Sequence, residues 1–402
     1  MSPRSKQEYL EAIYLRYKKA SLKEKVAILD EFCLNCGYHR KHAVRVLNNF
    51  KRFIKPKPKK RGKPSKYNKP SVLEPLKRIY LTANLPCSKR LKAIIPLWLP
   101  SYLSEFGSLG KDSVEALLEI SAPTIDRLLK PVRVKYRGRG RSTTKPGTLL
   151  KKQIPIKTNQ WDETRPGFLE ADTVAHCGES LLGEFVYTID LVDIATGWSE
   201  QRAVWGKGET GVLKQIQDVE DRLPFPLLGF DCDNGSEFLN YHLLRHFSQR
   251  EKPVKFTRSR PYHKDDNAHV EQKNWTHVRQ WFGYHRFSNP VLVPLMNDLY
   301  THEWSCYHNF FMPSVKLVEK KLVAGKHIKR YDSPKTPYQR IMESPYIAAS
   351  VKQSLKEQFE TLNPFRLRKI IENKLKTIFS ICYSKKPLVT IPLNDLFTGN
   401  IY

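Results

Sequence analysis

The middle of the chain shows two periods of hydrophobic residues. Three short segments rich in apolar, β-branched and aromatic residues come first, which is the pattern of strands. Amphipathic segments with the 3.6-residue period of a helix follow, and short apolar segments separate them. The expected strands are residues 168–173, 185–191, 198–205, 227–232 and 254–257, and the expected helices are about 210–221, 236–247 and 267–281.

The order of these elements predicts the fold class. Three strands, then helix, strand, helix, strand and helix, are typical of a ribonuclease-H-like α/β domain. We therefore expect a mixed five-stranded sheet with flanking helices. The segments before residue 165 have helical patterns only, so all-α helix-turn-helix domains are expected to precede this core.

A small helical unit is expected near the N-terminus. Ser21 and Glu24 have the spacing of a capping box, so a helix begins there, and Gly37 ends it. Residues 38–47 then place basic side chains between apolar ones, as a DNA-recognition helix does after a short turn. The candidate DNA contacts on this helix are Arg40, Lys41 and Arg45.

A second helix-turn-helix is expected at residues 113–129, with its break at 121–123. Segments rich in lysine, arginine, proline and glycine flank this unit and suit extended linkers that follow a phosphate backbone. The expected division is a helix-turn-helix domain at 1–54, a basic linker at 55–70, a second helical domain at 71–132, a basic linker at 133–164, the α/β core at 165–305 and a basic C-terminal region at 306–402 that is helical beyond about residue 330.

The charge balance narrows the class of partner. The 402 residues include 69 Lys and Arg against 40 Asp and Glu, a formal net charge of +29. Such an excess favours an anionic partner, and nucleic acid is the first candidate, ahead of a ribosomal or membrane surface. The charge alone does not indicate which reaction the protein carries out.

The sequence predicts neither an export signal nor a membrane span. No apolar segment with a small-residue cleavage site follows Met1, and Pro96 and Pro100 interrupt the most apolar stretch, residues 91–103. The seven cysteines are scattered and odd in number, which suits reduced thiols. We expect a cytoplasmic, nucleoid-associated protein.

Three acids stand where elements of the expected core end or begin. Asp172 lies in the first strand, Asp233 follows the fourth strand at an Asn-Gly turn, and Glu271 lies in the first turns of the last helix. Each acid alone has an ordinary structural explanation, as a turn, cap or solvated residue. Together they have the chemistry that two divalent metal ions need for phosphodiester cleavage and strand transfer.

The sequence around these acids resembles a known family. Residues 230–238, Phe-Asp-Cys-Asp-Asn-Gly-Ser-Glu-Phe, and residues 260–274, Arg-Pro-Tyr-His-Lys-Asp-Asp-Asn-Ala-His-Val-Glu-Gln-Lys-Asn, look like the integrase-core DDE transposases, which share their core with retroviral integrases. The likeness covers about residues 165–300, and the interval 271 − 233 = 38 is close to the family's usual spacing. It implies that Asp172, Asp233 and Glu271 bind Mg²⁺ or Mn²⁺, and that a homo-oligomer pairs two double-stranded DNA ends.

Other acids of the core are expected to be structural. Asp231 shares a strand face with Asp233 but lies before the strand end, and Asp190 lies within a strand. Asp193 is expected to form a turn with Thr196 and Gly197. Two more acids, Asp265 and Asp266, are expected in the loop or cap before the last helix.

Basic and amide side chains near the third acid are candidate DNA contacts or ligand supports. The basic candidates are Lys264, Lys273 and Arg279, and the amides are Asn234 and Asn267. Three aromatic residues of the same segment are expected in the core: Trp275, Trp281 and Phe282.

The expected function is a DNA transposase that cleaves the ends of a mobile element and joins the freed 3′-hydroxyl to target DNA. Two alternatives remain open. One is a ribonuclease-H-type nuclease that only hydrolyses, although the basic helical N-terminal region disfavours it. The other is a DNA-binding regulator derived from a transposase, which the intact set of acids disfavours.

Overall fold

The computed structural model describes residues 1–50, 66–136, 163–233, 235, 237–259, 268–323 and 326–383. Contacts divide the chain into two compact units, residues 1–65 and 66–402. Most of the linkers expected at 55–70 and 133–164 lie outside the described residues, as do residues 384–402. The other domain boundaries expected from the sequence stay predictions.

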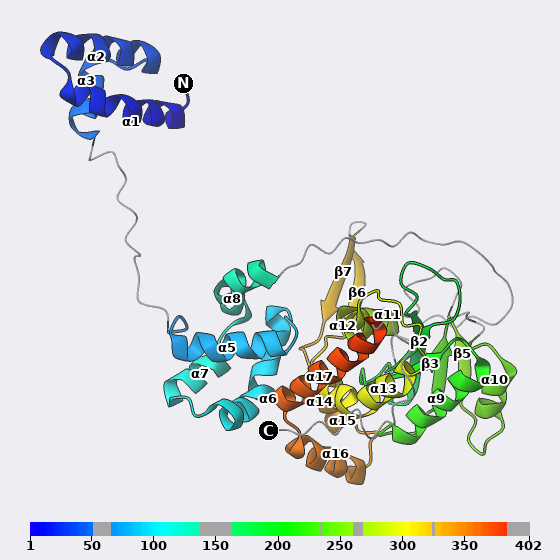
Figure 1. Cartoon of the computed structure of the whole chain (residues 1–402). Coiled ribbons are helices and arrows are strands. Elements are labelled where there is room, and N and C mark those ends of the chain that lie inside the picture. The colour runs from blue at the N-terminus through cyan, green and yellow to red at the C-terminus, as the bar shows by residue number, and fades with distance from the viewer. Residues whose placement is uncertain are drawn as a thin grey trace. The chain divides into compact units, whose positions relative to one another are not determined.

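The N-terminal unit consists of helices α1 (Pro3–Lys19), α2 (Leu22–Cys36) and α3 (Arg40–Asn48) (Figure 1). The expected capping box of Ser21 and Glu24 is present at the start of α2. Gly37, at φ 66°, ends this helix with its N–H on the Cys33 carbonyl, as expected. The three helices enclose a small core around Phe32, which is fully buried.

Four helices open the second unit: α5 (Pro70–Thr82), α6 (Ser88–Phe106), α7 (Lys111–Glu119) and α8 (Ala122–Tyr136). The expected break within residues 91–103 is wrong, because α6 continues through Pro96 and Pro100. Each proline removes one backbone donor. The helix keeps its course because its apolar side is buried, with Trp98 edge-on against Tyr307 and Phe365. Among the described helices, none has both the length and the apolar character needed to cross a membrane.

The fold class expected from the sequence is confirmed in the next segment. Strands β1 (Phe168–Ala175), β2 (Val186–Asp193), β3 (Ser199–Trp205), β4 (Gly229–Cys232) and β5 (Lys255–Arg258) form one mixed sheet in the order β3-β2-β1-β4-β5. The first three strands are antiparallel, and β4 and β5 add in parallel. This is the ribonuclease-H-like arrangement.

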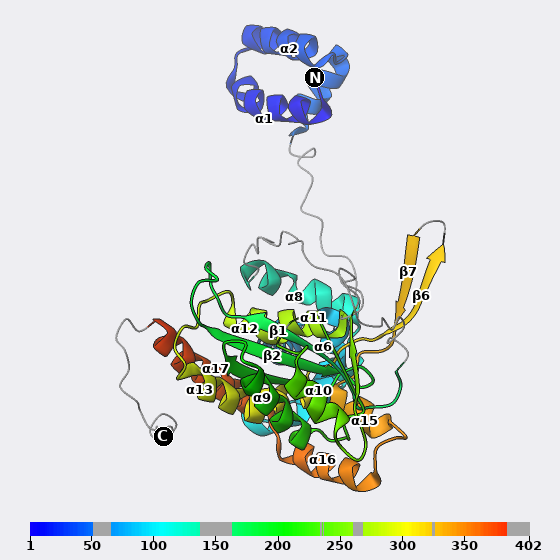
Figure 2. The same ribbon diagram turned by 90° about the vertical axis from the view of Figure 1, so that its right-hand side faces the viewer.

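Helices cover both faces of this sheet. Helix α9 (Glu209–Arg222) packs on one face, where the guanidinium of Arg202 in β3 donates to Asp218 at 2.6 Å. A continuous helical segment covers the other face, made of α11 (Ala268–Lys273), the π-helix η2 (Asn274–Arg279) and α12 (Gln280–Phe282). Figure 2 shows α11 and α9 on opposite sides of β1 and β2.

Helix α10 (Tyr241–Ser248) begins five residues later than the expected start at 236. Asn240 supplies the cap, since its side chain accepts from the Leu243 N–H at 2.9 Å. The described residues between β4 and α10 therefore lie outside any helix, which matters for the site below.

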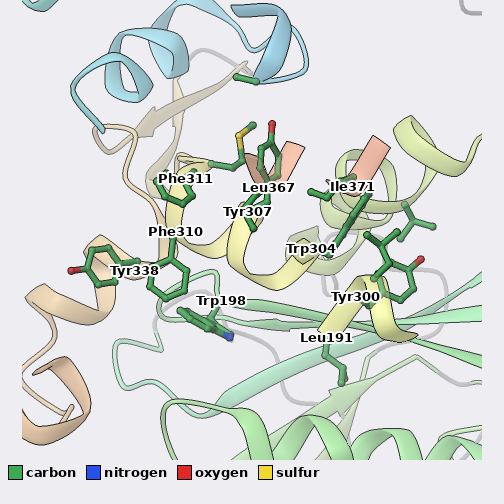
Figure 3. Close-up of a cluster of buried hydrophobic side chains, with 14 of the residues drawn as sticks. Leu191, Trp198, Tyr300, Trp304, Tyr307, Phe310, Phe311, Tyr338, Leu367 and Ile371 are labelled. Atoms are coloured by element: carbon green, nitrogen blue, oxygen red, sulfur yellow. The ribbon is translucent and has the colours of Figure 1, made fainter. Parts of the chain in front are cut away.

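The C-terminal part shares its core with the sheet and with α6. Helix α13 (Leu292–Leu299), the π-helix η3 (Tyr300–Trp304) and α14 (Ser305–Phe311) form a second long segment, and its aromatic side chains pack under α17 (Pro364–Tyr383) (Figure 3). The labelled side chains of this cluster include Trp198, Tyr300, Trp304, Tyr307, Phe310, Phe311, Tyr338, Leu367 and Ile371.

The helices expected beyond residue 330 are present as α15 (Pro337–Glu343), α16 (Ala349–Thr361) and α17. The sequence did not predict the hairpin before them, formed by β6 (Leu317–Val323) and β7 (Lys326–Tyr331). Its lysine-rich strands lack the clear apolar alternation by which strands are recognised.

Candidate active site

The parallel pairing of β1 with β4 brings the first two acids together. The register places Ala171 opposite Cys232, so the next residues, Asp172 and Asp233, follow at the same level of the two strands. Strand β4 ends at Cys232, whereas β1 continues to Ala175. Asp233 therefore stands at a strand end beside the middle of β1.

Asp172 is held by two hydrogen bonds. One carboxylate oxygen accepts from the Thr173 N–H at 2.7 Å, and the other accepts from the Asn274 side-chain amide at 2.6 Å. Burial, and then the nearby charges of Asp233 and Glu271, together raise the pKa of Asp172 to about 7, although its hydrogen bonds act in the opposite direction. The carboxylate is thus fixed in place among like charges.

Asp233 is shaped by its own turn. Its Oδ1 accepts from the Gly235 N–H at 2.9 Å, and burial raises its pKa. A Cβ at Gly235 would lie 2.6 Å from Glu237 Oε2 and 2.9 Å from Asp233 Oδ1, so a side chain there would force one or both carboxylates to move. The candidate Asn234 lies outside the described residues.

Glu237 is a buried neighbour that the sequence analysis missed. It accepts from Thr173 Oγ1 at 2.9 Å and from Lys207 Nζ at 2.5 Å. Burial opposes its ionisation, yet the Lys207 partner lowers its pKa overall. An acid four residues after Asp233 in the same turn was the available signal.

Glu271 lies in the first turns of the helix that covers this face of the sheet, and its side chain is exposed. The negative charge of Glu271 acts on both Asp172 and Glu170, because it contributes to the raised pKa of each carboxyl group. The π-helix begins three residues later, at Asn274. Short π-helical turns within α-helices are frequent at functional sites, and this one presents Asn274 to Asp172.

Glu170 fixes the start of the same helix. Its Oε2 accepts from the backbone N–H groups of His269 at 3.0 Å and Val270 at 3.1 Å. Burial raises the pKa of Glu170 to about 8. The sequence analysis missed this acid, although Glu170 and Asp172 occupy one face of an otherwise apolar strand, and that spacing was the visible signal.

Asp190 is a further buried acid next to the site. Asp190 pairs with Asp172 in the β1–β2 register and is fully buried, with its Oδ1 accepting from Gln201 at 2.8 Å. Burial raises the pKa of Asp190 to about 8 and lowers that of Lys273 to about 8, while their mutual attraction opposes both shifts. The structural role expected of Asp190 agrees with this position.

The phosphate contact expected of Lys273 is wrong, because its side chain is only 7% exposed. The Nζ of Lys273 lies 3.3 Å from His277 Nε2, and the charge of Lys273 acts on Asp190 in β2. The helical period turns Lys273 inward, whereas Glu271 and Trp275 are exposed. A basic residue two positions after a candidate metal ligand can therefore lie in the core.

The other candidate DNA contacts differ in placement. Lys41 and Arg45 are exposed on α3, whereas Arg40, also exposed, forms an ion pair with Asp30. Arg279 donates to the carbonyls of Ala175 and Gly283 and packs over the Tyr284 ring. Four further residues lie outside the described part of the chain: Lys264, Asp265, Asp266 and Asn267.

The remaining structural expectations are mostly met. Asp193 forms the expected turn, accepting from the Thr196 N–H and hydroxyl at 2.7 and 2.6 Å. Asp231 is buried and accepts from the Thr257 hydroxyl at 2.6 Å. Phe282 is in the core, but Trp275 is 51% exposed, so its expected burial is wrong.

The acid set has the chemistry of a site for hard divalent metal ions. Burial and like charge both raise the pKa of Asp172, a cost that a bound dication would relieve. The Asn274 Oδ1 beside it is buried without a hydrogen-bond partner. Within the described residues, no three Asp, Glu, His or Cys side chains lie close enough together to form a metal site.

Comparisons with known proteins show what the chain is similar to. The "Uncharacterized protein y4rM" of Sinorhizobium fredii (strain NBRC 101917 / NGR234) is 38% identical over 343 residues, which span 85% of this chain and 96% of that protein. The crystal structure of the catalytic core domain of BIV integrase is 15% identical, with a TM-score of 0.28, over 44% of this chain and 95% of that one. No family model matches the sequence.

Proposed function

The chain belongs to the same protein family as y4rM of Sinorhizobium fredii, and we propose that it is a DNA transposase of the DDE type. One observation carries the proposal. The β1–β4 register sets Asp172 beside Asp233, and the helix with Glu271 begins over the same face of the sheet. A set of carboxylates at this position suits phosphoryl transfer on DNA.

Asp172, Asp233 and Glu271 would hold Mg²⁺ or Mn²⁺. When bound, the metal ions supply charge neutralisation at the phosphate and lower the pKa of the attacking hydroxyl. The chain's own groups do the positioning: Asn274 orients the Asp172 carboxylate, and Glu170 fixes the helix start near Glu271. Supports of this kind usually change activity by tenfold or more.

DNA binding is assigned to exposed basic side chains outside the acid site. Helix α3 presents Lys41 and Arg45 to solvent, four residues apart on one face. This arrangement supports a recognition role for the N-terminal unit. Pairing of two DNA ends by a homo-oligomer belongs to the same proposal, through the family resemblance of the core.

The test is nicking and joining of DNA fragments taken from both sides of the coding sequence. Labelled fragments are incubated with a supercoiled plasmid and Mg²⁺ or Mn²⁺, using the unaltered chain, Glu271→Gln and a surface control, Glu357→Gln in α16. The proposal predicts nicked and joined products with the unaltered chain and the control only. Because Glu357 is exposed, its substitution removes the same charge far from the site.

Three other outcomes would each revise the proposal. Hydrolysis without joining would favour the ribonuclease-H-type nuclease. Binding of the fragments with no cleavage under either metal ion would favour the DNA-binding regulator. Equal activity of Glu271→Gln would remove Glu271 from the ligand set.

A further inference from the structure

The β6–β7 hairpin stands out from the body of the second unit. Figure 1 and Figure 2, related by a quarter turn, both show it extending away from the sheet and the helices around it. Strand β6 pairs with β7 alone, in a separate two-stranded sheet. A lone two-stranded hairpin is only marginally stable in water, so a partner surface would add to its stability.

The base of the hairpin is firmly attached. The Lys316 N–H donates to Asp332 Oδ1 at 2.6 Å, and Arg340 forms a 2.6 Å ion pair with the same carboxylate. Lys316 Nζ also donates to the Ala195 carbonyl, between β2 and β3, at 2.7 Å. An arm fixed at its base in this way presents its strands in a defined direction.

Six described side chains of the arm are exposed, and they are of two kinds. The apolar ones are Val318, Ile328 and Tyr331, which are 63%, 57% and 51% exposed. The basic ones are Lys321, Lys329 and Arg330, and Lys321 forms an ion pair with Glu319 at 2.6 Å. Exposed apolar residues beside basic ones, without packing against the body, are typical of a binding surface.

The charge of the arm selects the partner. Residues 316–331 contain six basic residues, Lys316, Lys320, Lys321, Lys326, Lys329 and Arg330, against the single acid Glu319. A second copy of the arm would bring like charges together along the strand edges, which disfavours pairing between copies. A polyanion is the complementary partner.

We propose that the β6–β7 hairpin is a DNA-binding arm that lies along or within a groove of double-stranded DNA. The basic side chains contact phosphates, and the exposed apolar side chains contact sugars and base edges. A two-stranded ribbon has the width that the major groove of B-DNA admits. The choice of duplex DNA rests on the proposed function, while the surface is separate from the acid site.

The first test is a salt titration of duplex binding by the full chain, without metal ions. The variant Lys329→Ala/Arg330→Ala is compared with Lys352→Ala/Lys356→Ala, which removes the same charge from α16. Each lost phosphate contact lowers the slope of log K against log salt by about 0.9, so the arm variant is expected to lose about 1.8 and the control none. An unchanged slope in the arm variant overturns the proposal.

The second test places a photoreactive p-benzoylphenylalanine at Ile328, and at the exposed Tyr346 as a control. Crosslinking to DNA from position 328 alone is the expected result. Crosslinks between two chains would instead make the hairpin a contact between copies. Both tests measure DNA binding and not cleavage. If the arm binds DNA in a chain that never cleaves it, the proposed function fails while this inference stands.

Discussion

Asn274 donates a 2.6 Å hydrogen bond to Asp172, across 102 positions of the sequence. The bond joins the first residue of the π-helix to the middle strand of the sheet. It therefore ties the helix of the third acid to the first acid. We expect the acid site to depend on this hydrogen bond as well as on the acids themselves.

Replacement of Asn274 by alanine is expected to reduce DNA nicking by roughly 10- to 100-fold, the usual effect of losing a ligand support. Without the amide, the Asp172 carboxylate keeps only the Thr173 N–H as a described partner. DNA binding should not change, since Asn274 is only partly exposed and lies beside the acids. Asn373→Ala, exposed on α17, is the control, and equal loss in both variants would contradict the assignment.

Gly235 is expected to tolerate no side chain. A Cβ there would lie 2.6 Å from Glu237 Oε2 and 2.9 Å from Asp233 Oδ1, so Gly235→Ala should displace Asp233 and abolish most nicking. Gly208→Ala is the matched control, because nothing lies within 4 Å of its added Cβ. Nicking rates are measured together with the thermal midpoint. Full activity in Gly235→Ala would mean that the Asp233 turn can shift without consequence.

An acid-dependent stability is expected from Glu220. Burial opposes its ionisation, but hydrogen bonds from Arg250 and His246 lower its pKa overall. A depressed pKa stabilises the folded state above the unfolded pKa, and this contribution is lost as the pH falls through the folded pKa. Glu220→Gln should therefore cost about 1 kcal/mol near neutral pH, and the difference should shrink below about pH 4.3. Urea unfolding at several pH values measures it.

The sequence predicted the sheet well because its strands are buried. Strands β1 to β5 appear within about two residues of the expected ranges, since apolar runs between turn residues mark buried strands. The hairpin was missed because its strands lie in solvent and have no apolar face to reveal them. The break expected at Pro96 and Pro100 was wrong because burial of α6 against the rest of the unit outweighs the local cost of each proline in the helix.

The sequence indicated the three candidate acids but not the residues that support them. Asp172, Asp233 and Glu271 follow from order, turn signals and spacing. Glu170 and Asn274 act through partners about 100 residues away in the sequence. Lys273 was misassigned because the direction of a helical side chain depends on which face meets the sheet, and a short polar helix gives no clear apolar stripe.

Substitution of Lys273 tests whether this side chain acts in the core and not on DNA. Lys273→Met is expected to lower the free energy of unfolding, because it removes the positive charge that attracts the buried Asp190 carboxyl group. The salt slope of DNA binding should stay unchanged, since the lysine contacts no phosphate. The double variant Lys273→Met/Asp190→Asn should recover part of the stability. A reduced salt slope in the single variant would instead restore Lys273 as a DNA contact.

Two substitutions of Glu170 test whether its carboxylate fixes the start of the helix and whether this contact affects DNA nicking. Its carboxylate accepts two backbone N–H groups at the start of the helix that carries Glu271. Glu170→Ala leaves both donors without this acceptor and should cost about 1–3 kcal/mol, whereas Glu170→Gln keeps an acceptor oxygen and should cost less. Nicking should fall in the same order, and hydrogen exchange at His269 and Val270 should be fastest in the alanine variant. If the alanine variant exchanges no faster at these two amides, Glu170 does not fix the helix start, and its burial needs another explanation.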